Sequence, residues 1–368
     1  MGKKICFSLT VTFFILSAIT YPHANWAAEG PTGALTKFHP SAIDPSAGID
    51  SLLQQVIVHT ILQEYKEALA LTDSVIRLIP NEPAGYFFRA AVLQSRILDY
   101  ETFEDEKPFF KASTTCRKLA QKKLSQRNDE AWAHFFIGSA LGYEAFYLGK
   151  KRRYFEAFRT GWQSIQHLEA ALRFDPQLYD VYLGIGTYKY YRSKLSKNFK
   201  WLPFVKDERE TGILMVREAL AKGRYSRAAA LNGLSWILMD ENRNEEALAL
   251  ADSALRLYPG SRFFLWGAGE AAFRVGRYEQ ASACYRQILQ SLQNENRLSP
   301  YLELVARTRL AKVCQAADKM DEACRELKRV SEIELSKDDR ERGEEYLRAA
   351  ERYRKNCQAT LTGVHRGP

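Results

Sequence analysis

Apolar positions follow one another along this chain with the period of α-helices, and the whole pattern returns at an interval of about 34 residues. The clearest copy pairs four small or aliphatic side chains with four others one period later: Leu231, Leu234, Ala247 and Ala254 recur as Leu265, Ala268, Ala281 and Ile288. A fixed period of this length is typical of stacked two-helix units, because one such unit cannot bury its apolar face alone. The pattern therefore predicts an all-α solenoid.

Two segments that are far apart in the sequence share the pattern of the second helix of the unit. The segments YKEALALTDSVIRLIP and NEEALALADSALRLYP begin at Tyr65 and Asn244, and both carry Ala at their fourth position and Pro at their last. The alanine lets a partner helix approach closely, and the proline ends the helix. In the first helices, Gly186 and Gly269 occupy the matching position, and we expect each to leave room for the alanine opposite.

On these positions the chain resembles the tetratricopeptide-repeat family, whose unit carries Leu-Gly and an aromatic in its first helix, then Ala, an aromatic, Ala and Pro. The resemblance covers roughly Ile49 to Ser336 and implies a right-handed superhelical solenoid of about seven helix-turn-helix units. The predicted units begin near Ile49, Pro83, Asp129, Tyr179, Ala228, Arg262 and Leu304. A weaker resemblance, over Tyr179 to Met239, is to the Iml2/TTC39-like tetratricopeptide proteins, and it implies no function here.

Three aromatic-rich insertions interrupt the repeats, over Asp99 to Lys111, Gly149 to Phe158 and Ser193 to Glu208. We expect them to form extended helix ends or packed loops rather than solvated loops. After the repeats, Ser336 and Asp339 have the spacing of a capping box. This predicts a polar capping helix over residues 337–358, such as a repeat stack needs at its end, followed by a disordered tail over 359–368.

Residues 1–28 differ from the rest of the chain. Lys3 and Lys4 precede an apolar run from Ile5 to Ile19, which is the layout of a secretory signal peptide. Residues 29–48 then form a linker to the predicted solenoid over 49–336. An uncleaved membrane anchor is the alternative interpretation. We expect the protein to be exported, as a periplasmic or cell-envelope protein.

Composition agrees with a folded domain, since 46% of the 368 residues are hydrophobic and 26% are charged. The formal charge of +9 falls to +7 without Lys3 and Lys4. Local basic clusters fit anionic lipid or nucleic acid, or simply solvated helix faces. Export argues against nucleic acid as a partner.

The five cysteines after the signal are Cys116, Cys284, Cys314, Cys324 and Cys357. An odd number cannot all pair within one chain. Cys314 and Cys324 lie on facing helices of one predicted unit and form the candidate disulfide, and most of the others are expected to be buried thiols.

No catalytic, cofactor or metal motif is present, so the sequence predicts a non-enzymatic protein without cofactor or metal. The six histidines lie far apart in sequence, and His59 and His134, on predicted helices, are expected to have structural roles.

The resemblance also implies a binding surface, because the concave wall of such solenoids comes from fixed positions of the first helices. The candidate partner-binding residues at these positions are Phe87, Tyr190, Asn232, Trp236, Phe263, Trp266, Glu270 and Phe273. Because this predicted groove is rich in aromatic residues, we expect its ligand to be an apolar or amphipathic segment of another protein. The alternative is that Trp236 and Trp266 belong to the core.

These features predict an exported scaffold that binds another protein or peptide. A second hypothesis is a peripheral protein that contacts an anionic membrane surface through the basic aromatic insertion at 190–206. Its candidate contact residues are Lys194, Lys197, Phe199, Lys200, Trp201 and Phe204.

Overall fold

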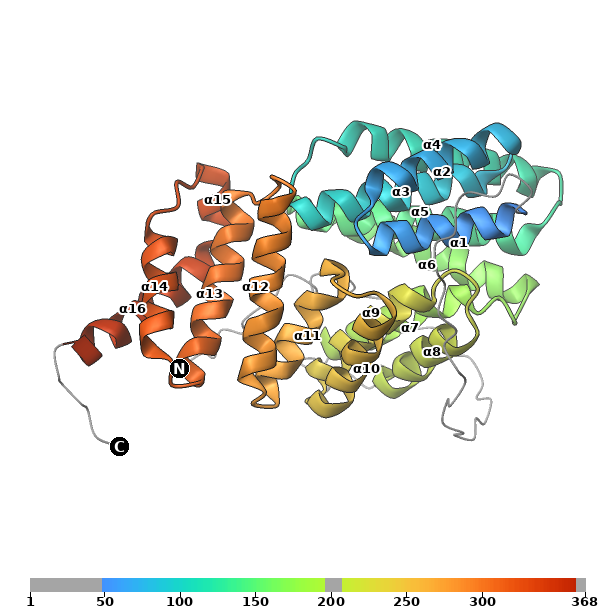
Figure 1. The fold of residues 1–368 in the computed structure, drawn as a ribbon. Coiled ribbons are helices and arrows are strands. Elements are labelled where there is room, and N and C mark those ends of the chain that lie inside the picture. The colour runs from blue at the N-terminus through green and yellow to red at the C-terminus, as the bar shows by residue number, and fades with distance from the viewer. Residues whose placement is uncertain (1–47, 196–206, 362–368) are drawn as a thin grey trace. The chain divides into compact units, whose positions relative to one another are not determined.

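The computed structural model describes residues 48–195 and 207–361, where every regular element is a helix (Figure 1). The helices are α1 (Ile49–Ile61), α2 (Tyr65–Leu78), α3 (Pro83–Tyr100), α4 (Glu106–Ser125), α5 (Glu130–Lys150), α6 (Tyr154–Phe174), α7 (Asp180–Leu195), α8 (Arg209–Lys222), α9 (Arg227–Asp240), α10 (Asn244–Leu257), α11 (Arg262–Arg274), α12 (Tyr278–Asn294), α13 (Pro300–Ala316), α14 (Met320–Ser331), α15 (Lys337–Arg342) and α16 (Glu344–Leu361). Helices α1 to α14 form seven consecutive pairs, which confirms the predicted all-α repeat fold.

Five of these pairs share one kind of turn. Three residues separate the two helices, and the middle residue has a left-handed backbone: φ is 64° at Gln63, 59° at Arg152, 62° at Asn242, 79° at Gly276 and 60° at Asp318. The next backbone N–H then donates to a carbonyl five residues earlier, as from Arg243 to Leu238 and from Arg277 to Ala272, both at 2.8 Å. This bond satisfies a carbonyl left open at the end of the first helix. The turn thus repeats along the chain with the helices.

Helices α7 and α8 pack backbone against backbone. A Cβ on Gly186 would lie 2.7 Å from the carbonyl oxygen of Gly212, and a Cβ on Gly212 would lie 2.5 Å from that of Gly186. The prediction of an alanine opposite the first-helix glycine is therefore wrong here, because a second glycine faces Gly186. At Gly269 the neighbours are the side chains of Tyr285 and Cys284.

Two insertions lengthen helices, as predicted. Helices α5 and α6 each contain 21 residues. The buried ring of Phe109, at the start of α4, lies 5.6 Å from that of Tyr147. Phe155 is instead 79% exposed, so this aromatic of the second insertion does not pack. Most of the third insertion lies outside the described residues.

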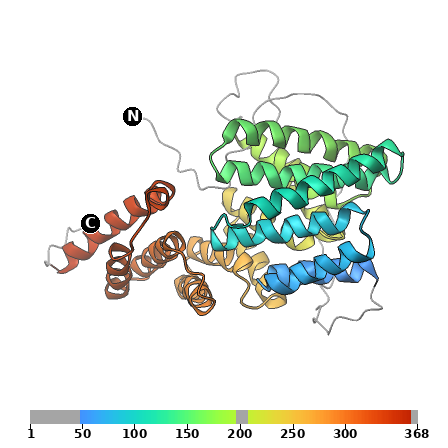
Figure 2. The ribbon, with the colours of Figure 1, turned by 90° about the horizontal axis from the view of Figure 1, so that it is seen from above.

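The chain divides into two compact units. Of the described residues, the first unit contains those up to Thr60, those of Glu64–Ser95 and those of Glu104–Leu234. The second unit contains those of Ile61–Gln63, those of Arg96–Phe103 and those from Ser235 onward. In Figure 2 the blue-to-green helices of the first unit run side by side, and Figure 1 shows α12, α13 and α14 of the second unit doing the same.

A buried carboxylate organises one corner of the first unit. Asp180, at the start of α7 and 5% exposed, accepts backbone N–H groups from Arg224 at 3.0 Å and from Tyr225 and Ser226 at 2.7 Å. Asp50 of α1 accepts the Tyr225 hydroxyl at 2.7 Å. The turn before α9 is therefore held by carboxylates from two other helices.

In the second unit, a buried arginine anchors the start of α11. Arg262 is 1% exposed and donates to both carboxylate oxygens of Asp99, at 2.9 and 2.6 Å, and to Glu295 at 2.9 Å. Burial alone lowers the pKa of Arg262, but these carboxylates outweigh it and raise the pKa. The guanidinium is therefore a fixed positive charge in the core.

The C-terminal segment consists of two helices. Ser336 caps α15, accepting the Asp339 N–H at 3.1 Å as the capping-box spacing predicts, but α15 ends at Arg342 and α16 begins after Gly343. A Cβ on Gly343 would lie 2.6 Å from Leu304, so this break follows from packing against α13.

One disulfide fixes α16. It joins Cys324 of α14 to Cys357, with Cα atoms 5.8 Å apart. The predicted pair of Cys314 with Cys324 is wrong, because the buried Cys314 thiol donates to Glu322 at 3.5 Å instead. Cys116 and Cys284 are buried free thiols, as expected for most of the cysteines.

Candidate protein-binding face

Two of the eight candidate residues lie in the core. Phe87 is 5% exposed and its ring stacks on Tyr143 at 5.5 Å, with Phe135 and Phe136 also in contact. Tyr190 is fully buried. The close packing of the first-unit helices turns both positions inward, so neither side chain offers a surface to a partner and both leave the candidate set.

The other six candidates are half-buried. Asn232 belongs to the first unit, and Trp236 lies on the part of α9 in the second unit. The remaining four, Phe263, Trp266, Glu270 and Phe273, follow one another on α11. Helix α11 therefore presents most of the predicted residues within one unit.

Side chains of α13 and α16 join those of α11 in what we call the Trp266 cluster, defined as Trp266, Glu270, Phe273, Arg309, Lys312 and Tyr346. The Arg309 guanidinium lies 6.0 Å from the Trp266 ring centre and 5.9 Å from that of Tyr346. It also donates to Glu270 at 3.0 Å. Arg309 thus links the three helices.

Neighbouring cations keep the Glu270 carboxyl of the cluster ionised. Burial raises the pKa of Glu270, but Arg309, Arg274 and Lys312 outweigh it and lower the pKa overall. Arg274 donates to the same carboxylate at 2.8 Å. Glu270 therefore stays ionised, and three cations surround one anion. A carboxylate held ionised in this way is not poised to donate a proton.

Sequence reasoning missed Arg309, Lys312 and Tyr346. For Lys312 the signal existed, since it occupies in the seventh predicted unit the position that Glu270 occupies in the sixth. Tyr346 lies beyond the repeats, on α16, and no repeat position pointed to it. Arg309 follows a fixed wall position by one residue and reaches the cluster through its long side chain.

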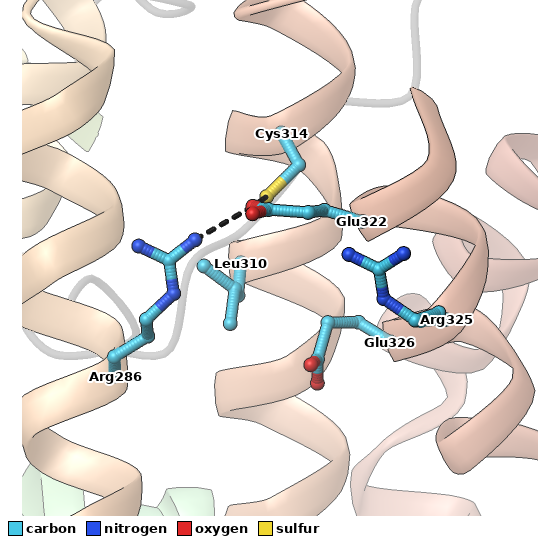
Figure 3. Close-up of a pocket in the computed structure, with 6 residues that line it drawn as sticks. All are labelled: Arg286, Leu310, Cys314, Glu322, Arg325 and Glu326. Carbon is cyan, nitrogen blue, oxygen red and sulfur yellow. Dashed lines mark hydrogen bonds and ion pairs between the residues drawn. The ribbon is translucent and has the colours of Figure 1, made fainter. Parts of the chain in front are cut away.

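The second unit also contains a small cavity. Arg286, Leu310, Cys314, Glu322, Arg325 and Glu326 enclose about 120 Å³. Figure 3 shows Arg286 and Cys314 both directed at Glu322, with Arg286 donating at 2.7 Å. Burial and the bond to Glu322 raise the pKa of Cys314 to about 11, so this thiol is not an activated nucleophile.

The membrane-contact residues mostly fall outside the described part of the chain. Lys194 is half-buried at the end of α7, whereas Lys197, Phe199, Lys200, Trp201 and Phe204 lie outside the described residues. Among the helices of 48–195 and 207–361, none is long and apolar enough to cross a bilayer.

No protein-family profile and no curated protein matches the chain. Solved structures do match it in part. The C-terminal part of a TPR repeat-containing protein from Cytophaga hutchinsonii is 14% identical, with a TM-score of 0.40 over 79% of this chain and 98% of that one. A Rap protein complexed with competence and sporulation factor is 14% identical, with a TM-score of 0.43 over 86% and 87%. PilW, a type IV pilus biogenesis factor, is 21% identical, with a TM-score of 0.38 over 62% and 93%. At these scores, no functional conclusion rests on the matches.

The helices and the sequence together define the class. Seven consecutive helix pairs, a recurring left-handed turn and a regular spacing of small residues make this an all-α helical-repeat protein. Its repeat pattern resembles that of the tetratricopeptide-repeat family, and the fold agrees with that resemblance.

Proposed function

We propose that this protein is a non-enzymatic, exported scaffold that binds a segment of another protein through the Trp266 cluster. The single observation that carries the proposal is the row of half-buried aromatics on α11 beside the cations of α13. Partly exposed aromatic side chains supply much of the binding energy at protein interfaces. Phe263 and Trp236, on the same wall by repeat position, extend the apolar surface.

The charges narrow the class of partner. Within the Trp266 cluster, Arg309 and Lys312 act on the one carboxylate, Glu270, so the basic side chains of the cluster outnumber the acidic one. A complementary segment carries apolar side chains together with Asp or Glu. We therefore propose an acidic amphipathic peptide as the ligand.

Export rests on the apolar run near the N-terminus, which precedes the described residues, and on the cysteines. The pairing of Cys324 with Cys357 supports an oxidising compartment, because disulfides persist there and are rare in a reducing cytosol. Fusing the segment 1–48 to alkaline phosphatase tests export: phosphatase activity supports it, and an inactive fusion contradicts it.

Selection from a phage-displayed library of random peptides tests the binding proposal. Selected peptides should be rich in Asp, Glu and apolar residues, and Trp266→Ala should weaken their binding by about 2 kcal/mol, or about 30-fold in Kd. Phe155→Ala is the matched control, because it truncates an exposed aromatic of the other unit. Circular dichroism on each variant separates loss of binding from loss of fold. Equal binding by the Trp266 variant and wild type would overturn the proposal.

Flotation with vesicles of phosphatidylcholine and phosphatidylglycerol tests the membrane hypothesis. Our proposal predicts that the protein stays with the soluble fraction. If the protein instead floats with the anionic vesicles, and the phage library yields no selected peptide, the results favour the insertion at 190–206 as the functional element.

A further inference from the structure

Two histidines that are far apart in sequence meet in the first unit. The Nδ1 atoms of His134 on α5 and His167 on α6 lie 2.9 Å apart, and the ring centres are 5.1 Å apart. Sequence separation argued against any site formed by histidines, but the long, adjacent helices α5 and α6 bring this pair together. His134 is hydrogen-bonded, as a structural role predicts, yet its partner is another potential metal ligand.

The surroundings hold this pair in place. The ring of Phe174, at the end of α6, stacks on His134 with centres 5.6 Å apart and planes 15° apart. Both histidines are half-buried. The charged groups that act on His134 are Glu130, which favours a cation there, and Arg173, which opposes one.

We propose that His134 and His167 together form a binding site for a divalent transition-metal ion, with Cu²⁺ and Ni²⁺ preferred. Imidazole is a good ligand for these ions, and both accept adjacent nitrogens at right angles. Metal–imidazole bonds of about 2.0–2.1 Å at a right angle place the two nitrogens about 2.9 Å apart. The observed separation has this value, which is also the length of the hydrogen bond that joins the rings, so both rings have to turn to direct their lone pairs at the ion. A tetrahedral ion needs about 3.3 Å and thus some movement of the rings.

The proton balance of binding is simple. In the hydrogen-bonded pair, one ring carries its proton on Nδ1 and donates it in a hydrogen bond. The Nδ1 lone pair of the other ring accepts that hydrogen bond. For both Nδ1 lone pairs to bind one ion, the first ring moves that proton to Nε2, and the net charge of the pair is unchanged. Burial lowers the pKa of both histidines, which favours their neutral forms.

The site differs from a structural zinc centre. In the described parts of the chain, no group of three or more His, Cys, Asp or Glu side chains is placed to hold a metal. The ion therefore takes two ligands from the protein and the rest from water, which makes binding reversible and the protein folded without metal.

Titration of the full-length, untagged, metal-free protein with CuCl₂ at pH 7 tests the proposal, with calorimetry for affinity and electron paramagnetic resonance for the ligands. We expect one ion with two nitrogen ligands. His134→Gln and His167→Gln should each weaken binding at least about tenfold, since the loss of a group that merely supports a ligand already costs that much. Phe174→Leu, which removes the stacked ring but no ligand, should keep the two-nitrogen signal.

Circular dichroism melting of each variant guards against misfolding as the cause of a loss. Wild-type affinity in the two histidine variants would overturn the proposal and place Cu²⁺ on other residues. Absence of binding to the wild type would overturn it as well and leave the pair a hydrogen bond only.

Discussion

The Lys312 ammonium lies 3.9 Å from the centre of the Phe273 ring, so a cation of α13 sits on an aromatic ring of α11. A cation in this position attracts the ring and keeps its positive charge. The pairing of aromatic with cation repeats at Trp266 and Arg309. On the function that we propose, these paired aromatic and basic side chains would contact an acidic amphipathic peptide.

Lys312→Met therefore tests charge recognition. Removing the ammonium while keeping a long side chain should weaken binding of a selected acidic peptide by about 1 kcal/mol at low salt, and less at high salt, where wild type and variant should converge. Fluorescence anisotropy at two salt concentrations measures this. Lys118→Met, on the exposed surface of α4, is the control. Equal affinities of the Lys312 variant and wild type at low salt would refute the charge argument.

Arg262→Ala should destabilise the protein by about 3–5 kcal/mol, because it removes the guanidinium that pairs with the buried carboxylate of Asp99. Asp99 has a side chain only 9% exposed. Arg277→Ala breaks an exposed pair with Glu245 in the same unit and should cost less than about 1 kcal/mol. Urea unfolding of both variants gives the comparison, and similar losses would mean that the buried network does not anchor α11.

Two glycines should respond oppositely to alanine. Gly276 has a left-handed backbone and open space around it. Replacing it with alanine should therefore destabilise the fold by about 1 kcal/mol through backbone strain alone. Gly233 lies within α9, with the nearest atom 3.9 Å from an added Cβ. Gly233→Ala should stabilise by about 0.5–1 kcal/mol, because alanine has the higher helix propensity. Thermal unfolding measures both changes. A stabilising shift in the Gly276 variant would contradict the strain argument, and a destabilising shift in the Gly233 variant would contradict the propensity argument.

The disulfide should control the stability of α16. Cys357→Ser should speed amide hydrogen exchange in α16, since a crosslink of this loop size contributes about 2–4 kcal/mol. Cys284→Ser, which changes a buried free thiol, controls for the substitution and should leave α16 unchanged. If the amides of α16 in the wild-type protein exchange at the same rate with and without reductant, a structural role for the disulfide is contradicted.

Acid should destabilise the first unit through the histidine pair. The pKa values of His134 and His167 are lowered in the folded state, by burial first and then by neighbouring positive charge. The unfolded chain therefore binds protons more readily than the folded chain. The stabilisation from the neutral histidines is complete above about pH 6.5, the ordinary histidine pKa, and is lost as the pH falls through the lowered pKa values of the folded state. Urea unfolding at pH 7 and pH 5 should show a smaller loss in the variant with both histidines changed to Gln. An unchanged loss in that variant would place the acid sensitivity elsewhere.

The repeat pattern predicted the fold well because it depends on side-chain size at regular intervals. Small residues and terminal prolines fix where helices meet and end, and α2 and α10 end where those prolines require. Burial at a given wall position is harder to predict. Phe87 turned out to be core because Phe135, Phe136 and Tyr143 surround it, and no repeat position encodes that neighbourhood.

Contacts between distant segments were beyond sequence reasoning for the same reason. The pairing of Cys324 with Cys357 depends on where α16 turns back after Gly343, and the meeting of His134 with His167 depends on two lengthened helices. Lys312 is different, because it occupies in the seventh predicted unit the concave-wall position that Glu270 occupies in the sixth, and the sequence alone shows this.

Hydrogen–deuterium exchange with a selected acidic peptide tests the central claim most directly. The proposal predicts slower exchange on peptide binding in α11 and α13, with Trp266→Ala abolishing the change. Slower exchange confined to other helices, with α11 and α13 unaffected, would contradict the claim that the Trp266 cluster is the binding face.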